Sequence, residues 1–374
     1  MSLVGVNLCW MVTGEVGGSE SYLTRVLTGV AEGAPAFDYR LFVLPGFAAA
    51  HPELAAAFPV DVAPVTGRQR SLRVAAESTW LANRARRAGV DVMHHGGGTV
   101  PPGPRRRTVL TIHDLQYLTY PEFFSSTKRR YLDAVMPRSA RRSDVVVTPS
   151  AFVKDTVVER LGVPSERIRV VPIPAELHPP EPAPSDEVRA RYGLGERPFF
   201  LYPAITYPHK NHIVLVEAMS AVVDRHPEAA LVLTAGSAGA ESALEAEIFR
   251  RNLAGHVRRT GRVAAADLER LYLDATALVM PSRYEGFGAP VVEAMQRGCP
   301  VIAANVTALP EIVGDAGILI DPGDVGGWAD AMCRLLDDGA VGDDLAARGN
   351  ARVSAFAADR AAAALEDAYR QALA

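Results

Sequence analysis

Short apolar runs alternate with amphipathic segments along the chain, and this alternation predicts its secondary structure. A short apolar run is typical of a strand buried in a parallel sheet, and apolar residues three and four apart are typical of a helix. The predicted strands are residues 4–8, 41–44, 91–94, 109–112, 145–148, 168–171, 199–202, 231–234, 257–261, 277–280 and 301–304. The predicted helices are residues 20–30, 72–88, 128–142, 151–161, 214–223, 242–253, 268–274, 290–297 and 357–374. This order of elements predicts an α/β protein with doubly wound parallel sheets.

One proline-dense segment without periodicity interrupts the alternation. Residues 172–186 have the composition of a linker rather than of a helix or strand. We therefore expect an N-terminal Rossmann-like domain at 1–175, a linker at 176–190 and a C-terminal Rossmann-like domain at 191–355. The 374 residues of the chain are enough for two domains with separate cores.

Residues 280–311 combine the features of a ligand-binding loop. The predicted strand 277–280 runs into a glycine-containing turn, and a helix between Pro290 and Gly298 leads into the next strand. Proline is tolerated in the first turn of a helix, and glycine commonly follows the last turn. Such a unit places its turn at the carboxyl end of a parallel strand, where open α/β sheets bind ligands.

The residue types in this turn suit a ligand that is anionic and rich in hydroxyl groups. Gly286 and Gly288 let the backbone approach a ligand closely, and free N–H groups at a helix start suit a phosphate. Glu285 and Glu293, with seven residues between them, offer carboxylate oxygens to adjacent sugar hydroxyls. Each residue alone would fit an ordinary crossover with solvated glutamates, whereas the combination indicates a binding site.

Lys210 is one of only three lysines in the chain, and it lies in a turn that follows the predicted strand 199–202. A lysine at the carboxyl end of a strand suits a phosphate oxygen, although most lysines are simply exposed. Gly17 and Gly18 stand in another strand–glycine–helix segment, for which a plain loop is the alternative.

Three histidines lie near predicted strand ends in the first half of the chain. His113 directly follows the strand 109–112, where it serves either in a site or as a structural residue at the strand end. His94 and His95 precede three glycines, and adjacent histidines in a strand point to opposite sides, which makes a poor metal site.

These motifs resemble those of a known family. The segment Glu285-Gly-Phe-Gly-Ala-Pro-Val-Val-Glu293 is similar to the E-x7-E signature of retaining, nucleotide-sugar-dependent glycosyltransferases of family 4. The resemblance extends through Gly298-Cys-Pro-Val and Ala308-Leu-Pro-Glu311, and it covers most of the chain. It implies the GT-B fold, in which two Rossmann-like domains face a central cleft. It also implies that 356–374 form a helix that crosses back to the first domain, rather than one packed on its own domain.

The resemblance implies roles for the candidate residues. The implied catalytic residues are His113, Lys210 and Glu285, with His113 across the cleft from Glu285. The implied donor-binding residues are Gly17, Gly18, Lys210, Arg262, Val263, Glu285, Gly286, Phe287, Gly288, Ala289 and Glu293. Many family members carry an arginine about six residues before the lysine, where this chain has Ala204. A second positive or donor group would then come from His209 or Arg262, or the site has only one.

The activity implied is transfer of a hexosyl group from a nucleotide sugar to a hydroxyl of a sugar, lipid-linked or small-molecule acceptor. The contexts of His113 and Lys210 look most like mannosyl-type members, so GDP-mannose is the favoured donor, with no metal and no further cofactor. One alternative is a sugar-nucleotide epimerase of the same fold, which would need acid and base groups on both sides of the sugar. Another is a non-catalytic, two-domain sugar-binding protein, which would normally carry a secretion signal.

Composition and charge bear on the partners and the cellular location expected for the protein. The net charge of −4 gives no reason to expect a nucleic-acid partner, and three cysteines without metal spacing are typical of a reduced protein. The first residues lack a signal-peptide pattern and no apolar run is long enough to span a membrane, so we expect a cytoplasmic protein. The basic helix 128–142 either covers a sheet or touches the inner membrane face, and the oligomeric state stays open.

Overall fold

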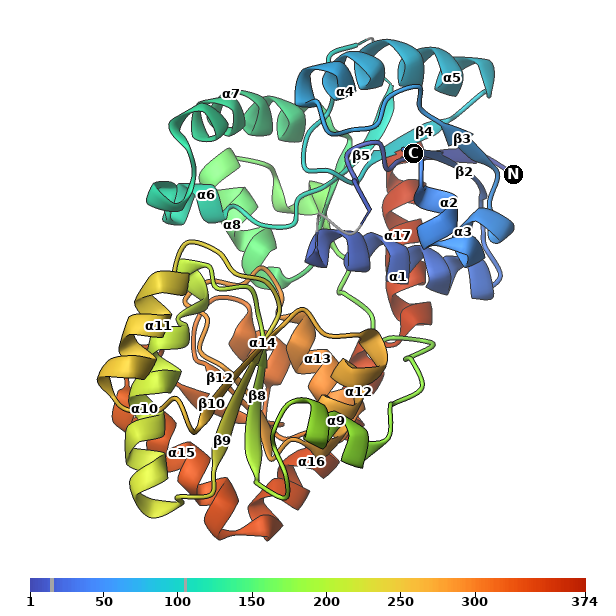
Figure 1. The fold of residues 1–374 in the computed structure, drawn as a ribbon. Helices are drawn as coiled ribbons and strands as arrows, with labels where there is room; N and C mark the ends of the chain where they lie inside the picture. The colour runs from blue at the N-terminus through green and yellow to red at the C-terminus, as the bar shows by residue number, and fades with distance from the viewer. Residues whose placement is uncertain (14–16, 104–105) are drawn as a thin grey trace. The chain divides into compact units, whose positions relative to one another are not determined.

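The computed structural model describes residues 1–13, 17–103 and 106–374, which divide into two units, each built on one parallel sheet (Figure 1). Unit 1 comprises Met1–Leu177 and Phe356–Ala374, and unit 2 comprises His178–Ala355. The predicted α/β fold with two Rossmann-like parallel sheets is confirmed.

The sheet of unit 1 has seven strands among the described residues. In spatial order they are β3 (Val60–Val62), β2 (Asp38–Val43), β1 (Leu3–Asn7), β4 (Val92–His95), β5 (Arg107–Thr111), β6 (Val145–Thr148) and β7 (Ile168–Val170). Its helices are α1 (Gly18–Glu32), α2 (Phe47–Ala50), α3 (Pro52–Ala57), α4 (Arg70–Ala76), α5 (Ala82–Arg87), α6 (Gln116–Thr119), α7 (Ser126–Arg142), α8 (Ala151–Leu161) and α17 (Ala358–Leu373). A π-helical turn, η1 (Glu77–Leu81), joins α4 to α5, and the short 3₁₀ turns are η2 (Pro121–Phe123) and η3 (Ser165–Arg167).

The last helix of the chain belongs to unit 1. α17 packs on α1 and against β4, β5, β6 and β7. A Cβ atom on Gly29 of α1 would lie 2.7 Å from the carbonyl oxygen of Ala358, so only glycine permits this close approach. Tyr369 of α17 is fully buried against this side of the sheet. Two apolar clusters lie under other helices, one with Met136 of α7 and one with Leu81 at the end of η1.

The sheet of unit 2 has six strands in the part of the chain that the structure describes. In spatial order they are β10 (Val257–Gly261), β9 (Ala230–Thr234), β8 (Phe199–Pro203), β11 (Ala277–Met280), β12 (Val301–Ala304) and β13 (Ile318–Ile320). Its helices are α9 (Ser185–Arg191), α10 (His212–Arg225), α11 (Glu241–Arg250), α12 (Ala265–Asp274), α13 (Ala289–Gln296), α14 (Leu309–Val313), α15 (Val325–Asp337) and α16 (Gly339–Val353). The 3₁₀ turns are η4 (Pro208–Lys210) and η5 (Ser354–Phe356).

Helix α9 begins within the expected linker 176–190 and packs on unit 2. Arg189 of α9 donates from Nε to the Oδ2 atom of Asp274 at 3.1 Å, and the backbone N–H of Ala183 donates to the carbonyl oxygen of Ala266. The proline-rich composition hides a helix start at Ser185, which is followed by two acidic residues that suit a first turn.

Candidate active site

Two loops of unit 2 meet at a pair of opposite charges. Lys210 ends the turn η4 after β8, and Glu285 lies in the loop between β11 and α13. Because β8 and β11 are neighbours in a parallel sheet, their carboxyl ends lie side by side. The Nζ atom of Lys210 donates to the Oε1 atom of Glu285 at 2.6 Å, with side chains only 21% and 12% exposed. The structure thus brings together two of the residues predicted to be catalytic.

Two side chains that the sequence interpretation missed hold the lysine turn in place. The hydroxyl of Tyr202, in β8, donates to the carbonyl oxygen of Lys210 at 2.9 Å and lies 2.8 Å from the Oγ atom of Ser282. Asn211 has a positive φ of 57° and donates from Nδ2 to the carbonyl oxygens of Pro281 and Pro322. These hydrogen bonds tie the turn to the loops after β11 and β13. The backbone position of Lys210 is therefore fixed.

The loop that carries Glu285 needs glycine at its end. Gly288 has a φ of 101° and precedes the first residue of α13, Ala289. A Cβ atom on Gly288 would lie 2.7 Å from the Cδ2 atom of Leu309, so a side chain there meets both strain and a clash. The backbone N–H of Glu285 donates to the Oγ1 atom of Thr307 at 3.1 Å. The side chain of Phe287 is buried, so any ligand contact at this position is to its backbone.

Glu293 lies farther along, within α13, and has a partner of its own. The hydroxyl of Tyr272 donates to its Oε2 atom at 2.9 Å, and burial beside this carboxylate raises the pKa of Tyr272 well above its usual value. The guanidinium of Arg297 lies 5.2 Å from the centre of the Tyr272 ring. The two glutamates of the E-x7-E pattern thus have different partners, a lysine for Glu285 and a tyrosine for Glu293.

The structure narrows the search for a second positive group near Lys210. Burial, and then the neighbouring charge of Lys210, lower the pKa of His209 to about 4, so His209 is neutral at pH 7 and supplies no positive charge. Arg262 follows β10 together with Val263, and its side chain is exposed. An exposed arginine that the sequence interpretation did not consider, Arg283, lies in the loop of Glu285, and its backbone N–H donates to the carbonyl oxygen of His209 at 2.8 Å.

The remaining candidates belong to unit 1. His113 donates from Nε2 to the carbonyl oxygen of Gly96 at 2.8 Å, and burial lowers its pKa, so the neutral ring keeps Nδ1 as an acceptor. Its ring meets the edge of Tyr22 at a centroid distance of 5.5 Å. Gly17, with a φ of 73°, precedes α1, and Gly18 is its first residue. The residues just before them in this predicted glycine turn, 14–16, lie outside the described residues.

His94 and His95 point to opposite faces of the sheet, as predicted for adjacent strand residues. The Nδ1 atom of His94 lies 2.8 Å from the hydroxyl of Tyr369, and its Nε2 atom lies 2.7 Å from the Oγ1 atom of Thr111. His95 contacts Asn7 instead. Burial lowers the pKa of both rings to about 3, so both are neutral.

The described residues contain neither a cluster suited to a metal ion nor a helix suited to span a membrane. Within 1–13, 17–103 and 106–374, no three or more histidine, cysteine or acidic side chains are grouped closely enough to bind a metal ion. Over the same ranges, no helix combines the length and apolar composition needed to cross a membrane.

Family models match both halves of the chain. The glycosyltransferase family 4 model matches residues 16–177, and the model of glycosyl transferases group 1 matches residues 197–338. O-antigen chain mannosyltransferase B from Escherichia coli is 30% identical over 283 residues, which cover 75% of this chain and 74% of the relative. A GDP-mannose-dependent alpha-(1-6)-phosphatidylinositol monomannoside mannosyltransferase from Mycobacterium tuberculosis is 29% identical, covering 68% of this chain and 76% of the relative.

Solved structures agree on the fold. Sucrose-phosphate synthase from Thermosynechococcus elongatus has a TM-score of 0.77 at 23% identity, with 99% of each chain covered. HepE from Anabaena, solved with UDP and glucose, has a TM-score of 0.75 at 20% identity, again with 99% of each chain covered. The sequence relatives, the family models and the two Rossmann-like sheets together show that this chain belongs to glycosyltransferase family 4, with the GT-B fold.

Proposed function

We propose that this glycosyltransferase is a retaining, metal-independent enzyme that transfers mannose from GDP-mannose to an acceptor hydroxyl. The observation that carries the proposal is the ion pair between Lys210 and Glu285 at the carboxyl ends of β8 and β11. An ammonium group suits the diphosphate of a nucleotide sugar, and a carboxylate beside it suits the hydroxyls of the attached sugar. We therefore expect the two side chains to bind the two sides of the bond that breaks.

The chemistry follows from where charge develops. As the sugar–phosphate bond breaks, negative charge builds on the leaving diphosphate, and Lys210 stabilises it together with backbone N–H groups at Gly286 and Gly288. The sugar becomes oxocarbenium-like, and a hydrogen bond from its hydroxyl to Glu285 strengthens in that state. The acceptor hydroxyl attacks from the face that the diphosphate leaves and passes its proton to the departing phosphate oxygen. Anomeric configuration is thereby retained without a protein nucleophile.

The ion pair has a consequence for binding. Without ligand, Lys210 and Glu285 satisfy one another at 2.6 Å. The donor must then replace one charge-assisted hydrogen bond by two, one from lysine to phosphate and one from sugar hydroxyl to glutamate. A nucleotide diphosphate without the sugar replaces only the first, which leaves Glu285 without its lysine partner. We therefore infer that the attached sugar contributes to donor affinity through Glu285.

Two kinds of observation support GDP-mannose as the donor. The names of the relatives include O-antigen mannosyltransferases and a GDP-mannose-dependent enzyme, and the sequence around Lys210 resembles mannosyl-type members. Another structure of HepE from Anabaena, in contrast, was solved with UDP-glucose. The proposed base-side residues, Arg262 and Val263, would contact the nucleobase mainly through the backbone. Calorimetric titration with GDP-mannose and UDP-glucose distinguishes the two donors.

The two rival functions make different predictions. A sugar-nucleotide epimerase would interconvert two nucleotide sugars without an acceptor, and a sugar-binding protein would release no nucleotide. A transferase releases nucleotide diphosphate in an amount that matches the glycosylated acceptor. Measuring free GDP and the anomeric configuration of the product by NMR therefore separates all three.

The sharpest test asks whether the two glutamates have different roles. We expect Glu293→Gln to weaken GDP and GDP-mannose alike, since a ribose contact is mostly uniform binding. Glu285→Gln should leave GDP binding nearly intact while transfer falls, because a contact to the sugar strengthens in the transition state. Glu245→Gln, whose side chain is 65% exposed on α11, is the matched control. Equal loss of GDP affinity in both variants would show that the division of roles is wrong.

We also propose that α7 brings the enzyme to a membrane that holds a lipid-linked acceptor. Lys128, Arg129 and Arg130 are exposed at its start, and the side chain of nearby Phe123 is 37% exposed. Basic and aromatic side chains together favour binding to an anionic lipid surface. Sedimentation with anionic vesicles should recover the protein, and neutral vesicles should not. Equal recovery with both would count against an electrostatic membrane contact.

A further inference from the structure

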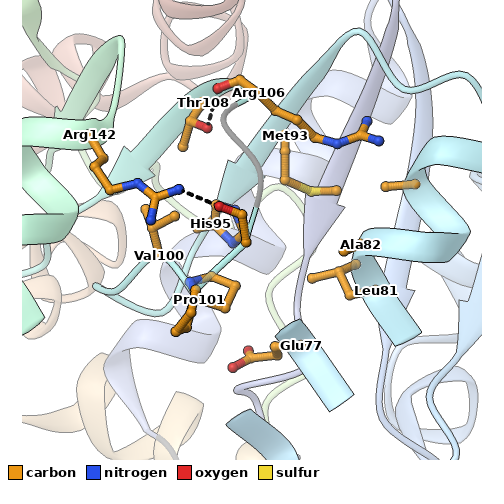
Figure 2. Close-up of a pocket in the computed structure, with 13 residues that line it drawn as sticks. Glu77, Leu81, Ala82, Met93, His95, Val100, Pro101, Arg106, Thr108 and Arg142 are labelled. Atoms are coloured by element: carbon orange, nitrogen blue, oxygen red, sulfur yellow. Dashed lines mark hydrogen bonds between the residues drawn. The ribbon is translucent and has the colours of Figure 1, made fainter. Parts of the chain in front are cut away.

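Unit 1 contains an open pocket that the proposed transfer reaction does not use (Figure 2). Its floor is the face of the sheet at β4 and β5, where Met93 and Thr108 are partners in the strand register. Leu81 lines one side, and Arg142 at the end of α7 lines another. The pocket thus lies between the apolar cluster under α5 and the cluster under α7.

The helical side of the pocket has an unusual backbone. Glu77 is the first residue of the π-helical turn η1 and Leu81 is the last, and both line the pocket. Ala82 and Ala85 continue this wall with small side chains, which leave the space open. π-Helical turns are rare and often occur at functional sites. A larger residue at either alanine would fill part of the space.

The hydrogen bonds of His95 determine which ring nitrogen, Nε2, can donate to a ligand in the pocket. The Nδ2 atom of Asn7 lies 3.1 Å from Nδ1 of His95 and donates to the Oε1 atom of Glu77 at 3.2 Å. An amide nitrogen can only donate, so Nδ1 accepts, and the proton of the neutral ring is on Nε2. His95 is 5% exposed, and none of the described residues accepts a hydrogen bond from Nε2.

A positive charge lies on the same side as this donor. Figure 2 shows Arg142 beside His95, with Leu81 and Ala82 on the opposite side and Glu77 at the lower end. Arg142 donates from Nη2 to the carbonyl oxygen of Gly103 at 2.8 Å, which orients the guanidinium and leaves its other N–H groups available. The pocket therefore combines the His95 donor and the guanidinium groups of Arg142 and Arg106 with an apolar wall opposite His95, and the carboxyl group of Glu77 lies at its lower end.

We propose that this pocket binds a small amphiphilic anion, a phosphate monoester or a carboxylate on a short apolar body. The anionic group accepts hydrogen bonds from Arg142 and from Nε2 of His95, and the apolar body lies against Leu81 and Met93. The site is independent of the donor site in unit 2. It is linked to His113, because the residue after His95 is Gly96, whose carbonyl oxygen accepts the hydrogen bond of His113.

Methionine methyl NMR tests the proposal directly, since Met93 lies in the pocket floor and Met93→Leu assigns its signal. The probes are n-hexyl phosphate, hexanoate, inorganic phosphate and n-hexanol. We expect hexyl phosphate or hexanoate to shift the Met93 signal in a saturable way, and the comparison of these two separates a phosphate site from a carboxylate site. Inorganic phosphate and hexanol should each bind at least about tenfold more weakly, since each lacks one half of the ligand.

Two variants complete the test. Arg142→Gln should weaken binding by about tenfold or more, the scale of one hydrogen bond to a charged group. Arg141→Gln, an exposed neighbour that does not line the pocket, is the matched control and should bind normally. Ala82→Phe should fill the pocket and abolish binding while GDP affinity stays unchanged. The proposal is overturned if no probe shifts Met93 up to ~10 mM, or if Arg141→Gln matches Arg142→Gln.

Discussion

The two units share one architecture and carry different chemistry at their strand ends. In unit 1, the polar groups at the end of β4 are histidines that burial keeps neutral, and each is paired with uncharged side chains. In unit 2, the loops after β8 and β11 carry an ammonium and a carboxylate, which pair with each other. A parallel sheet supplies the location of a site, and the loop residues supply its charge. Changes at the charged pair in unit 2 should therefore affect turnover, and changes at His94 in unit 1 should affect stability.

The largest expected effect is at Lys210. Lys210→Ala should lower turnover by roughly 10²–10³, the scale of losing one contact to a developing negative charge. Lys210→Arg should restore only part of it, because a planar guanidinium does not reproduce the geometry of an ammonium. Steady-state kinetics with GDP-mannose or the donor found by titration measures both. Normal turnover in the alanine variant would remove the chemical contrast between the units.

The matching change in unit 1 is His94→Leu. It leaves the hydroxyls of Tyr369 and Thr111 without their histidine partner inside the protein, which should cost about 2–3 kcal/mol of unfolding free energy. The double variant His94→Leu, Tyr369→Phe should recover part of the loss, since it removes one unpaired group as well. Denaturant unfolding measures both, and GDP affinity should not change. A loss of GDP affinity without a loss of stability would show that His94 serves ligand binding rather than stability.

The effect of pH on stability should be shared among several histidines. Folding lowers the pKa of five described histidines, and these are His94, His95, His113, His209 and His212. Each takes up a proton on unfolding below its unfolded pKa of about 6.5, so stability is highest above that pH and falls as pH drops toward 4. Unfolding followed from pH 8 to 4 checks this, and His94→Leu should reduce the slope. A flat profile would show that these rings titrate normally.

The smallest expected effect is that of chelation. We expect EDTA to leave turnover unchanged, because in the proposed mechanism the ammonium group of Lys210, rather than a divalent cation, binds the diphosphate. Turnover is measured after dialysis against EDTA and again after adding Mg²⁺ or Mn²⁺. If turnover is lost on dialysis and recovers when metal is added, a divalent cation rather than Lys210 supplies the positive charge at the diphosphate.

Local sequence patterns predict the positions of helices and strands better than they predict which residues contact each other. The segment around α13 is predictable because Pro290 and Gly298 mark its two ends, whereas the three residues of β13 form an apolar run shorter than that of any predicted strand. The ion pair between Lys210 and Glu285 was not predicted, since 75 positions separate the two residues and only the sheet order brings them together. His209 was considered as a positive group because a sequence does not show burial, which in the structure keeps the ring neutral.

The position of α17 in unit 1 bears on how the protein is made. Unit 1 contains the first residues of the chain and also Phe356–Ala374, with all of unit 2 between them. On the ribosome, His94 has no Tyr369 to contact, and Gly29 has no helix against it, until α17 is synthesised after all of unit 2. Unit 1, whose synthesis begins first, is therefore completed last. Unit 2 can finish folding while the sheet of unit 1 still has a face that α17 does not yet cover. A chaperone that protects nascent chains would find its longest-lived target in the N-terminal half of this enzyme.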